Sequence, residues 1–201
     1  LAVLGFNDDS DDTVLFEKIL DSSSGLNRPK DLAFNPFVPG QLWVVNYDDD
    51  SVVIVDEAGA NAQRSEHLID PYSLHFMEKV SSISFGNTDT FATCQESRNT
   101  YNDTYEGDDF MGPTLWTSDL SIFGKSNPEA VDYLSDAFGM PTDLGSHLDM
   151  NHETPLCMGI AWERDNVYWA FDGSDGSIDR NDFAQDHGPG YDDHSDGVIT
   201  R

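Results

Sequence analysis

Two histidines hold matching positions in two similar stretches of this 201-residue sequence. His75 lies ten residues before Phe85, His152 lies ten residues before Trp162, and each of these aromatic residues ends a short apolar segment. Neutral imidazoles with carboxylates nearby suit zinc, copper, iron or manganese. His75 and His152 are therefore candidate ligands of a transition metal.

His147 and Asp149 precede His152 closely and join the same candidate cluster. The spacing from His147 to His152 matches no standard metal motif. The alternative to a metal role is that these histidines hydrogen-bond loop backbone and pack around the rim of a channel.

A second concentration of metal-ligating side chains fills residues 186–197. Its glycines and proline predict a turn-rich loop, which holds two histidines and four carboxylates: His187, His194, Asp186, Asp192, Asp193 and Asp196. The loop could bind calcium through carboxylate oxygens or a transition metal through its imidazoles; a solvated acidic loop is the alternative. Because it follows a third strand, we expect it on the opposite face from His75 and His152, as a separate site.

Residues 96–112 predict a loop longer than an ordinary hairpin turn. Long loops on rigid scaffolds often bind ligands. Glu96 and Arg98 could bind a polar ligand there, or could form an ion pair with each other.

The sequence has no Gly-x-Ser-x-Gly elbow, phosphate loop, dinucleotide fingerprint or paired-cysteine metal motif, so nothing indicates serine-hydrolase or nucleotide-dependent chemistry.

Three features bear on the compartment. Cys94 and Cys157 are the only cysteines, and they are either two buried thiols or one disulfide. Asn102 begins a glycosylation sequon, Asn-Asp-Thr. The sequence starts at Leu1, which is compatible with a removed secretory signal. Together they favour an extracellular or secreted protein.

The charge is extreme. The chain has 38 acidic and 10 basic residues, which gives a formal net charge of −28. A phosphate backbone needs Lys and Arg to neutralise it, so nucleic acid is excluded as an expected partner. Such a field must be screened by salt or neutralised by cations. No stretch approaches the roughly 20 apolar residues that cross a bilayer, so we expect no membrane insertion.

The candidate residues lie between strands of a pattern that recurs three times. Each copy has an apolar strand, a polar turn, a strand rich in aromatic and β-branched residues, and a third strand. The copies comprise residues 31–34, 42–46 and 51–56; 80–85, 91–95 and 114–116; and 158–162, 167–171 and 177–179. Meanders repeated at roughly 60-residue intervals are typical of a β-propeller, so we predict an all-β propeller.

These copies resemble blades of the NHL-type six-bladed β-propellers. In that superfamily a Pro-x-Gly-Ile-Ala-like strand precedes a Leu-Tyr-Val-Ala-Asp-like strand, as do residues 29–34 with 42–46 and residues 158–162 with 167–172. Within a blade, the segment before the inner strand and the loop after the second strand lie on the same face, so we expect His75 and His152 at the mouth of the central channel, near His147 and Asp149. Some members of the superfamily, such as amidating lyases, place channel-facing histidines on a catalytic metal.

The repeat divides one propeller domain into blade units at about residues 26–60, 76–120 and 152–201, with an insertion at about 121–150. Ser126 to Glu129 has the spacing of a capping box and predicts a helix through Phe138; a helical turn is predicted at residues 63–68. Three blades cannot close a ring. We therefore expect the chain to continue, two copies to combine, or further strands at residues 1–20 and 120–144; continuation is the preferred interpretation.

Two functions follow as hypotheses. The first is an acidic, extracellular binding or assembly module that engages a protein or a glycan and holds calcium or other cations. The second is a metal-dependent lyase or hydrolase with His75 and His152 as ligands, assisted by Arg98 or Glu96. Propellers host both kinds of function, and the sequence has no catalytic motif, which favours the first.

Overall fold

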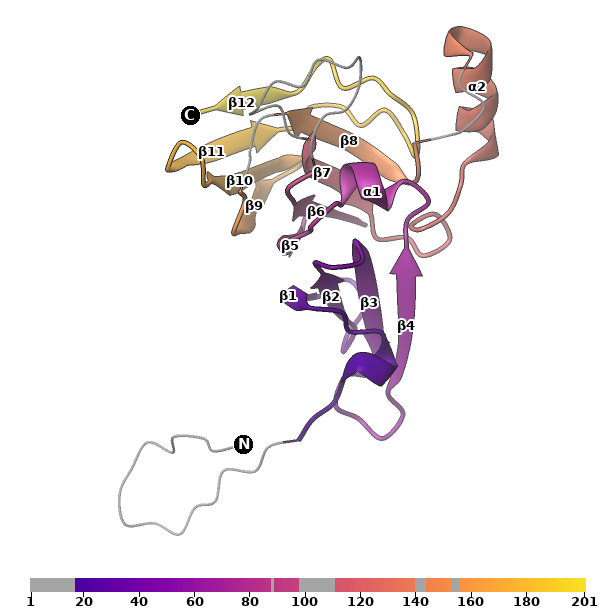
Figure 1. Cartoon of the computed structure of the whole chain (residues 1–201), viewed down its shortest axis with the longest axis vertical. Coiled ribbons are helices and arrows are strands. Elements are labelled where there is room, and N and C mark those ends of the chain that lie inside the picture. Colours follow the sequence, from indigo (N-terminus) through magenta and orange to yellow (C-terminus); the bar gives the residue numbers. More distant parts are fainter. Residues whose placement is uncertain (1–16, 88, 98–110, 140–143, 153–155) are drawn as a thin grey trace.

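The computed structural model describes residues 17–87, 89–97, 111–139, 144–152 and 156–201. They form three four-stranded antiparallel sheets, each made of four strands consecutive in the chain. The sheets follow one another in space as they do in sequence (Figure 1). The prediction of an all-β propeller-like fold is confirmed.

The first blade contains β1 (Pro29–Phe34), β2 (Leu42–Asn46), β3 (Ser51–Asp56) and β4 (Arg64–Ile69). The second contains β5 (Ser82–Phe85), β6 (Thr90–Cys94), β7 (Met111–Thr117) and β8 (His147–His152). The third contains β9 (Ile160–Arg164), β10 (Val167–Asp172), β11 (Ser177–Asp182) and β12 (Val198–Thr200). Three short helices accompany them: η1 (Ser22–Ser24), α1 (Ser73–Phe76) and α2 (Pro128–Phe138).

The first strands of the blades lie side by side, because β5 contacts both β1 and β9. Hydrogen bonds join these inner strands: the amide of Ile83 donates to Asp31 Oδ2 at 3.0 Å, and the amide of Trp162 donates to Ser84 Oγ at 3.2 Å. The fourth strands are then the outer edges of the blades, as in a propeller.

Each blade has an outer strand that the three-strand repeat did not include. The helical turn predicted at residues 63–68 is wrong, because this segment is β4 and pairs with β3 along its whole length. Most side chains of β4 are exposed, so the strand has no apolar alternation to reveal it. Strand β8 begins inside the segment assigned to the 121–150 insertion and ends two residues beyond it, and β12 completes the third sheet.

The helix predicted after Ser126 is present as α2. The side chain of Asn127, rather than Ser126, caps it by accepting a hydrogen bond from the amide of Glu129, and Gly139 ends it at φ 70°. An asparagine N-cap and a left-handed glycine after the last turn are standard helix ends. Ala130 and Leu134 face inward, so α2 lies against the blades as an insertion between β7 and β8.

Two apolar clusters fill the contacts between blades. Trp43 of the first blade is fully buried against the second, with its ring centroid 5.0 Å from Phe91 and 5.5 Å from Phe85. Leu115 of the second blade packs with Tyr168 of the third. Edge-to-face aromatic pairs of this kind contribute about 0.5–1.5 kcal/mol each beyond area burial.

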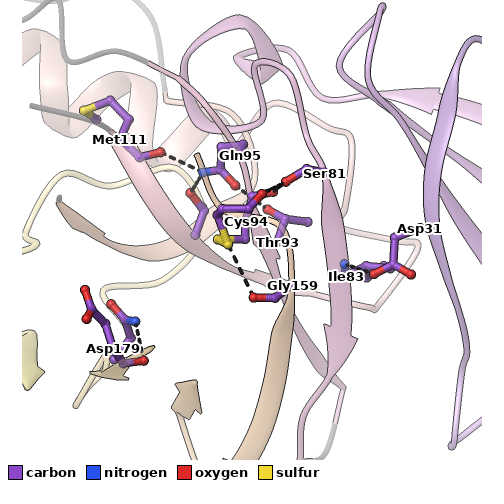
Figure 2. The surroundings of a disulfide bond; sticks show 12 residues. Asp31, Ser81, Ile83, Thr93, Cys94, Gln95, Met111, Gly159 and Asp179 are labelled. Carbon is purple, nitrogen blue, oxygen red and sulfur yellow. Dashed lines mark hydrogen bonds between the residues drawn. A yellow bond between two sulfur atoms is a disulfide. The ribbon is translucent and has the colours of Figure 1, made fainter. Parts of the chain in front are cut away.

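A disulfide also joins the second and third blades. Cys94 ends β6, and Cys157 precedes β9 by three residues; their Cα atoms are 5.6 Å apart. Figure 2 shows the disulfide beside Ser81, whose hydroxyl donates to the carbonyls of Cys94 and Cys157. Of the alternatives for the two cysteines, the structure has the disulfide.

Among the described residues, no helix is long and apolar enough to cross a membrane.

Candidate metal centre

Three imidazoles from two blades meet at the outer side of the fold. His147 begins β8, while His187 and His194 come from the segment that joins β11 to β12. One ring nitrogen from each lies within 4.8 Å of the others, so the three could hold a metal ion. His147 Nε2 and His194 Nε2 are 3.0 Å apart.

Backbone carbonyls orient the imidazole rings of His147 and His187, so that the Nε2 atom of each ring faces the site. His147 Nδ1 lies 2.8 Å from the carbonyl of Leu144, and His187 Nδ1 lies 2.6 Å from the carbonyl of Gly188. A carbonyl only accepts, so each Nδ1 carries the proton of a neutral ring. Each Nε2 then presents a lone pair, which is how carbonyl partners orient histidines that bind metals.

His187 Nε2 is buried and has no hydrogen-bond partner among the described residues. A buried acceptor without a partner is destabilising by about 1–3 kcal/mol, and such atoms in a folded protein call for an explanation. A ligand in the space that His187 shares with His147 and His194 would supply the missing interaction.

The imidazoles are held neutral. Burial lowers the pKa of His147 and of His187, and it lowers the pKa of His194 to about 3, with a further contribution from His187 next to it. Metal ions bind the neutral imidazole, so a lowered pKa removes the competing proton.

A bulge in β8 aims His147 into this site. Asp149 pairs with Leu115, but His147 pairs with Trp116, so Leu148 is an extra residue between them. Bulges reorient side chains in this way. The imidazole of His147 consequently stacks on Phe76, with ring centroids 3.7 Å apart.

The segment that carries His187 and His194 is bound to the second blade by backbone hydrogen bonds. The His187 amide donates to Leu148 O at 3.1 Å, and the Gly190 amide donates to His147 O at 2.9 Å. The side chain of Asn127, at the start of α2, donates to Pro189 O at 2.8 Å. A segment of the third blade is thus positioned by the second.

The expectation of two separate histidine sites is wrong. His147 joins His187 and His194, because its strand is the outer edge of the second blade and the β11–β12 segment folds over it. For the same reason His152, at the end of β8, does not lie at the mouth of a central channel. The site therefore combines one residue of an outer strand, His147, with two residues of the loop predicted at residues 186–197.

His75 and His152 lie near the cluster without belonging to it. Burial lowers the pKa of His75 to about 4, with a contribution from His152. Both also help to lower the pKa of His194. Five histidines therefore share one region, and three of them place nitrogens within ligand distance of one another.

The carboxylates of the 186–197 segment surround the histidines from outside. Asp193 is exposed and accepts hydrogen bonds from Ser195, which lower the pKa of Asp193. Asp196 accepts from the amide of Gln185 at 3.2 Å. Asp186 and Asp192 lie beside the histidines in the chain; Asp186 is exposed and Asp192 half-buried. None of the four belongs to the three-residue ligand set.

Asp149 is different, because it is fully buried between the second and third blades. Its Oδ1 accepts from the amide of Met150 at 2.7 Å, while Oδ2 has no partner among the described residues. Burial raises the pKa of Asp149 to about 8, and the charges of Asp196, Asp186 and Asp193 add to the effect. Asp149 therefore favours its neutral form.

The residues expected to bind a polar ligand are only partly described. Glu96 accepts a hydrogen bond from the Tyr47 hydroxyl at 3.1 Å. Arg98, its expected companion, and Asn102 of the sequon lie outside the described residues.

A further histidine was not singled out from the sequence. His67 Nε2 lies 2.8 Å from Ser51 Oγ and 3.3 Å from Asp49 Oδ2. A catalytic triad needs the acid and the serine on opposite ring nitrogens, whereas here both contact Nε2. The trio is therefore a hydrogen-bonded link between β3 and β4, hidden from sequence analysis because β4 was interpreted as helical.

No protein-family model matches the chain, and no curated protein matches it. Among solved structures, it is similar to a catalytically inactive variant of virginiamycin B lyase from Staphylococcus aureus, solved with quinupristin. The identity is 10%, the TM-score is 0.33, and the match covers 86% of this chain. The chain corresponds to about half of that protein, 54% of its length. The resemblance to NHL-type blades stays a prediction.

Proposed function

We propose that this protein is a metal-binding propeller module in which His147, His187 and His194 bind one divalent transition-metal ion through Nε2. The observation that carries the proposal is the orientation of the rings. Carbonyls hold the Nδ1 protons of two of them, and the buried Nε2 of His187 is left without a partner.

The donor set indicates the class of metal. Imidazole nitrogen suits zinc, copper, nickel or iron, whereas calcium takes oxygen ligands. Two zinc–nitrogen bonds of about 2.0–2.1 Å in a tetrahedron bring their nitrogens roughly 3.3 Å apart. The 3.0 Å between His147 Nε2 and His194 Nε2 is close to this value, so an ion needs only small movements of these two rings.

The position of the cluster gives the ion a structural role. It would link the outer strand of the second blade to the β11–β12 segment of the third, while Cys94–Cys157 links the same blades near their inner strands. The metal and the disulfide would then fix the contact between these blades at both ends.

A second candidate is metal-dependent hydrolysis or elimination at the same ion. Three protein ligands leave one position of a tetrahedron for water, and catalytic zinc sites have this form. His194 is only partly buried, so solvent could supply the fourth ligand. This candidate requires an exchangeable position on the ion, which the structural role does not.

The proposed setting is extracellular, where disulfides persist. There the acidic surface would bind cations, and the module would engage a protein or a glycan. These parts of the proposal depend on the charge of the chain and on the disulfide.

Metal analysis tests the main proposal. The purified chain would be stripped with a chelator, loaded with excess Co²⁺ or Zn²⁺, desalted and assayed by elemental analysis. We expect one ion per chain, lost in a His187→Ala, His194→Ala variant and kept in His67→Ala, which removes a histidine outside the cluster. A wild-type chain that retains no ion would contradict the proposal.

Cobalt also separates the two roles. Tetrahedral Co²⁺ gives a visible spectrum that responds when water at an open position is replaced. A spectrum that changes on adding azide would favour the hydrolytic candidate. A spectrum that azide leaves unchanged would favour a closed, structural site.

A further inference from the structure

The face of the third blade that points away from the second blade is apolar and exposed. Trp169, Phe171 and Ile178 lie on it and expose 40%, 50% and 56% of their surface. With Ile160 and Ala161 they line a hollow of about 180 Å³. Contiguous apolar patches on a soluble surface mark interaction sites.

The register of the strands gives Trp169 a counterpart in the first blade. Trp169 lies opposite Ala161 of the inner strand, as Trp43 lies opposite Ala33. Trp43 is fully buried because the second blade covers it. Trp169 occupies the same place on its own blade, and among the described residues no further sheet covers it.

A second pair of residues on the exposed face also has a counterpart in the first blade. Phe171 pairs with Ile178 across β10 and β11, and Val45 pairs with Val52 across β2 and β3. In both blades this pair is next to the pair that closes the hairpin turn, which is Asp172–Ser177 in the third blade and Asn46–Ser51 in the first. Val45 and Val52 are fully buried against the second blade. The exposed face of the third blade is therefore built like a face that packs on another blade.

The opposite end of the row of blades is already covered. On the first blade, Leu42 and Val44 point away from the second blade, and both are buried. Leu20 and Leu26, from the segment before β1, pack against them. A head-to-tail contact between two copies would have to displace this segment, whereas a contact between two third blades would not.

Charges on the exposed face are balanced, unlike those of the chain as a whole. Its carboxylates, Glu163 and Asp182, form ion pairs with Arg180, and Glu163 also pairs with Arg164. Two copies of a chain with a net charge of −28 repel each other. The repulsion is weaker at a surface whose carboxylates are paired with arginines. The paired charges therefore reduce the repulsion between two like chains at this face.

We infer that the third blade is a dimerisation surface: the face formed by Trp169, Phe171 and Ile178 packs on the same face of a second copy. A two-fold axis makes such a contact self-complementary. The inference is independent of the metal centre, which lies on the other side of the third sheet, against the second blade.

Sedimentation velocity at about 1 to 100 µM tests the dimer, in about 0.15 M and about 1 M NaCl, because salt screens the repulsion between acidic chains. We expect a species of twice 22.3 kDa that is favoured by the higher salt. Phe171→Glu and Ile178→Glu should each yield monomers. Phe138→Glu, on an equally exposed residue of α2, should stay dimeric.

Circular dichroism of each variant shows that it is folded, and Phe171→Ala, which adds no charge, gives a second and milder variant that should weaken the dimer. A wild-type chain that is monomeric at the highest concentration and salt would overturn the inference. A dimer that persists in both Glu variants, or an open series of oligomers, would also overturn it.

Discussion

His147 Nε2 and His194 Nε2 lie 3.0 Å apart, although 47 residues separate them and they belong to different blades. Because Leu144 O accepts the Nδ1 proton of His147, His147 Nε2 is an acceptor. In the metal-free protein, His194 must therefore donate its Nε2 proton across this contact. A metal ion could bind both nitrogens once His194 carries its proton on Nδ1 instead, which leaves Nε2 free as a ligand.

Zinc should stabilise the folded chain. An ion that binds only the folded state contributes about 2.7 kcal/mol when its free concentration is 100 times Kd. For a chain of this size that corresponds to a rise in Tm of roughly 5 to 10 °C. Calorimetry with chelator and with zinc measures the shift. His67→Ala should retain it and His194→Ala should lose it; an equal shift in His194→Ala would place the zinc elsewhere.

Without metal, the histidine cluster should make the fold sensitive to mild acid. The pKa of His194 is lowered to about 3 and that of His75 to about 4, while both protonate near 6.5 in the unfolded chain. The unfolded state binds more protons in between, so the stability that these histidines contribute is present above pH 6.5 and is lost as pH falls toward 4.

The measurement is the free energy of unfolding in urea between pH 7 and 4, with chelator present. A His75→Gln, His194→Gln variant should show a shallower loss of stability than the wild type. The matched variant His67→Gln should follow the wild type. Parallel curves for wild type and the double variant would mean that the cluster is not held neutral.

The second strands of the first two blades were predictable because they are short runs of buried apolar and β-branched residues. Leu42 to Val45 are all buried, and so is most of β6. The outer strands lack this signal: β4 exposes most of its side chains, and β8 mixes buried polar and apolar residues. In β8, apolar Leu148 and Met150 alternate with His147 and Asp149. This alternation is a strand pattern that the nearby helix signal obscured.

The site was predictable as residues but not as an arrangement. The density of histidine and aspartate at residues 186–197 identified His187 and His194. Their meeting with His147 depends on backbone hydrogen bonds to Leu148 and His147 and on the bulge at Leu148. Contacts between distant segments of different blades leave no local periodicity in the sequence. The match of His75 with His152 identified two histidines that lie close enough to interact electrostatically, but neither belongs to the ligand set.

Removing the charge of Asp149 should stabilise the protein near neutral pH. Its pKa is raised from 3.8 to about 8, so the folded state binds more protons than the unfolded state between these values. The stability it contributes is present below about pH 4 and is lost as pH rises toward 8. Asp149→Asn keeps the shape and removes this loss.

Urea unfolding of Asp149→Asn at pH 5 and at pH 8 is the measurement. We expect the free energy of unfolding of Asp149→Asn to exceed that of the wild type by more at pH 8 than at pH 5. Asp132→Asn, on the exposed side of α2, also removes one carboxylate. Its free energy of unfolding should differ little from that of the wild type at either pH. An Asp149→Asn variant that loses stability at pH 8 would mean that the ionised carboxylate has a partner, such as a bound cation.

Reduction of Cys94–Cys157 should weaken the contact between the second and third blades. The bond closes a loop of 63 residues, and the chain-entropy relation gives about 4 kcal/mol of stabilisation for a loop of that size. A Cys94→Ser, Cys157→Ser variant should unfold at a lower urea concentration, with a free energy of unfolding lower by about 4 kcal/mol. If zinc links the same two blades at their outer edge, saturating zinc should restore part of the loss, because both links restrain one interface. The control adds His187→Ala to the double serine variant. If zinc raises the free energy of unfolding equally with and without His187→Ala, the histidine cluster does not supply the second link.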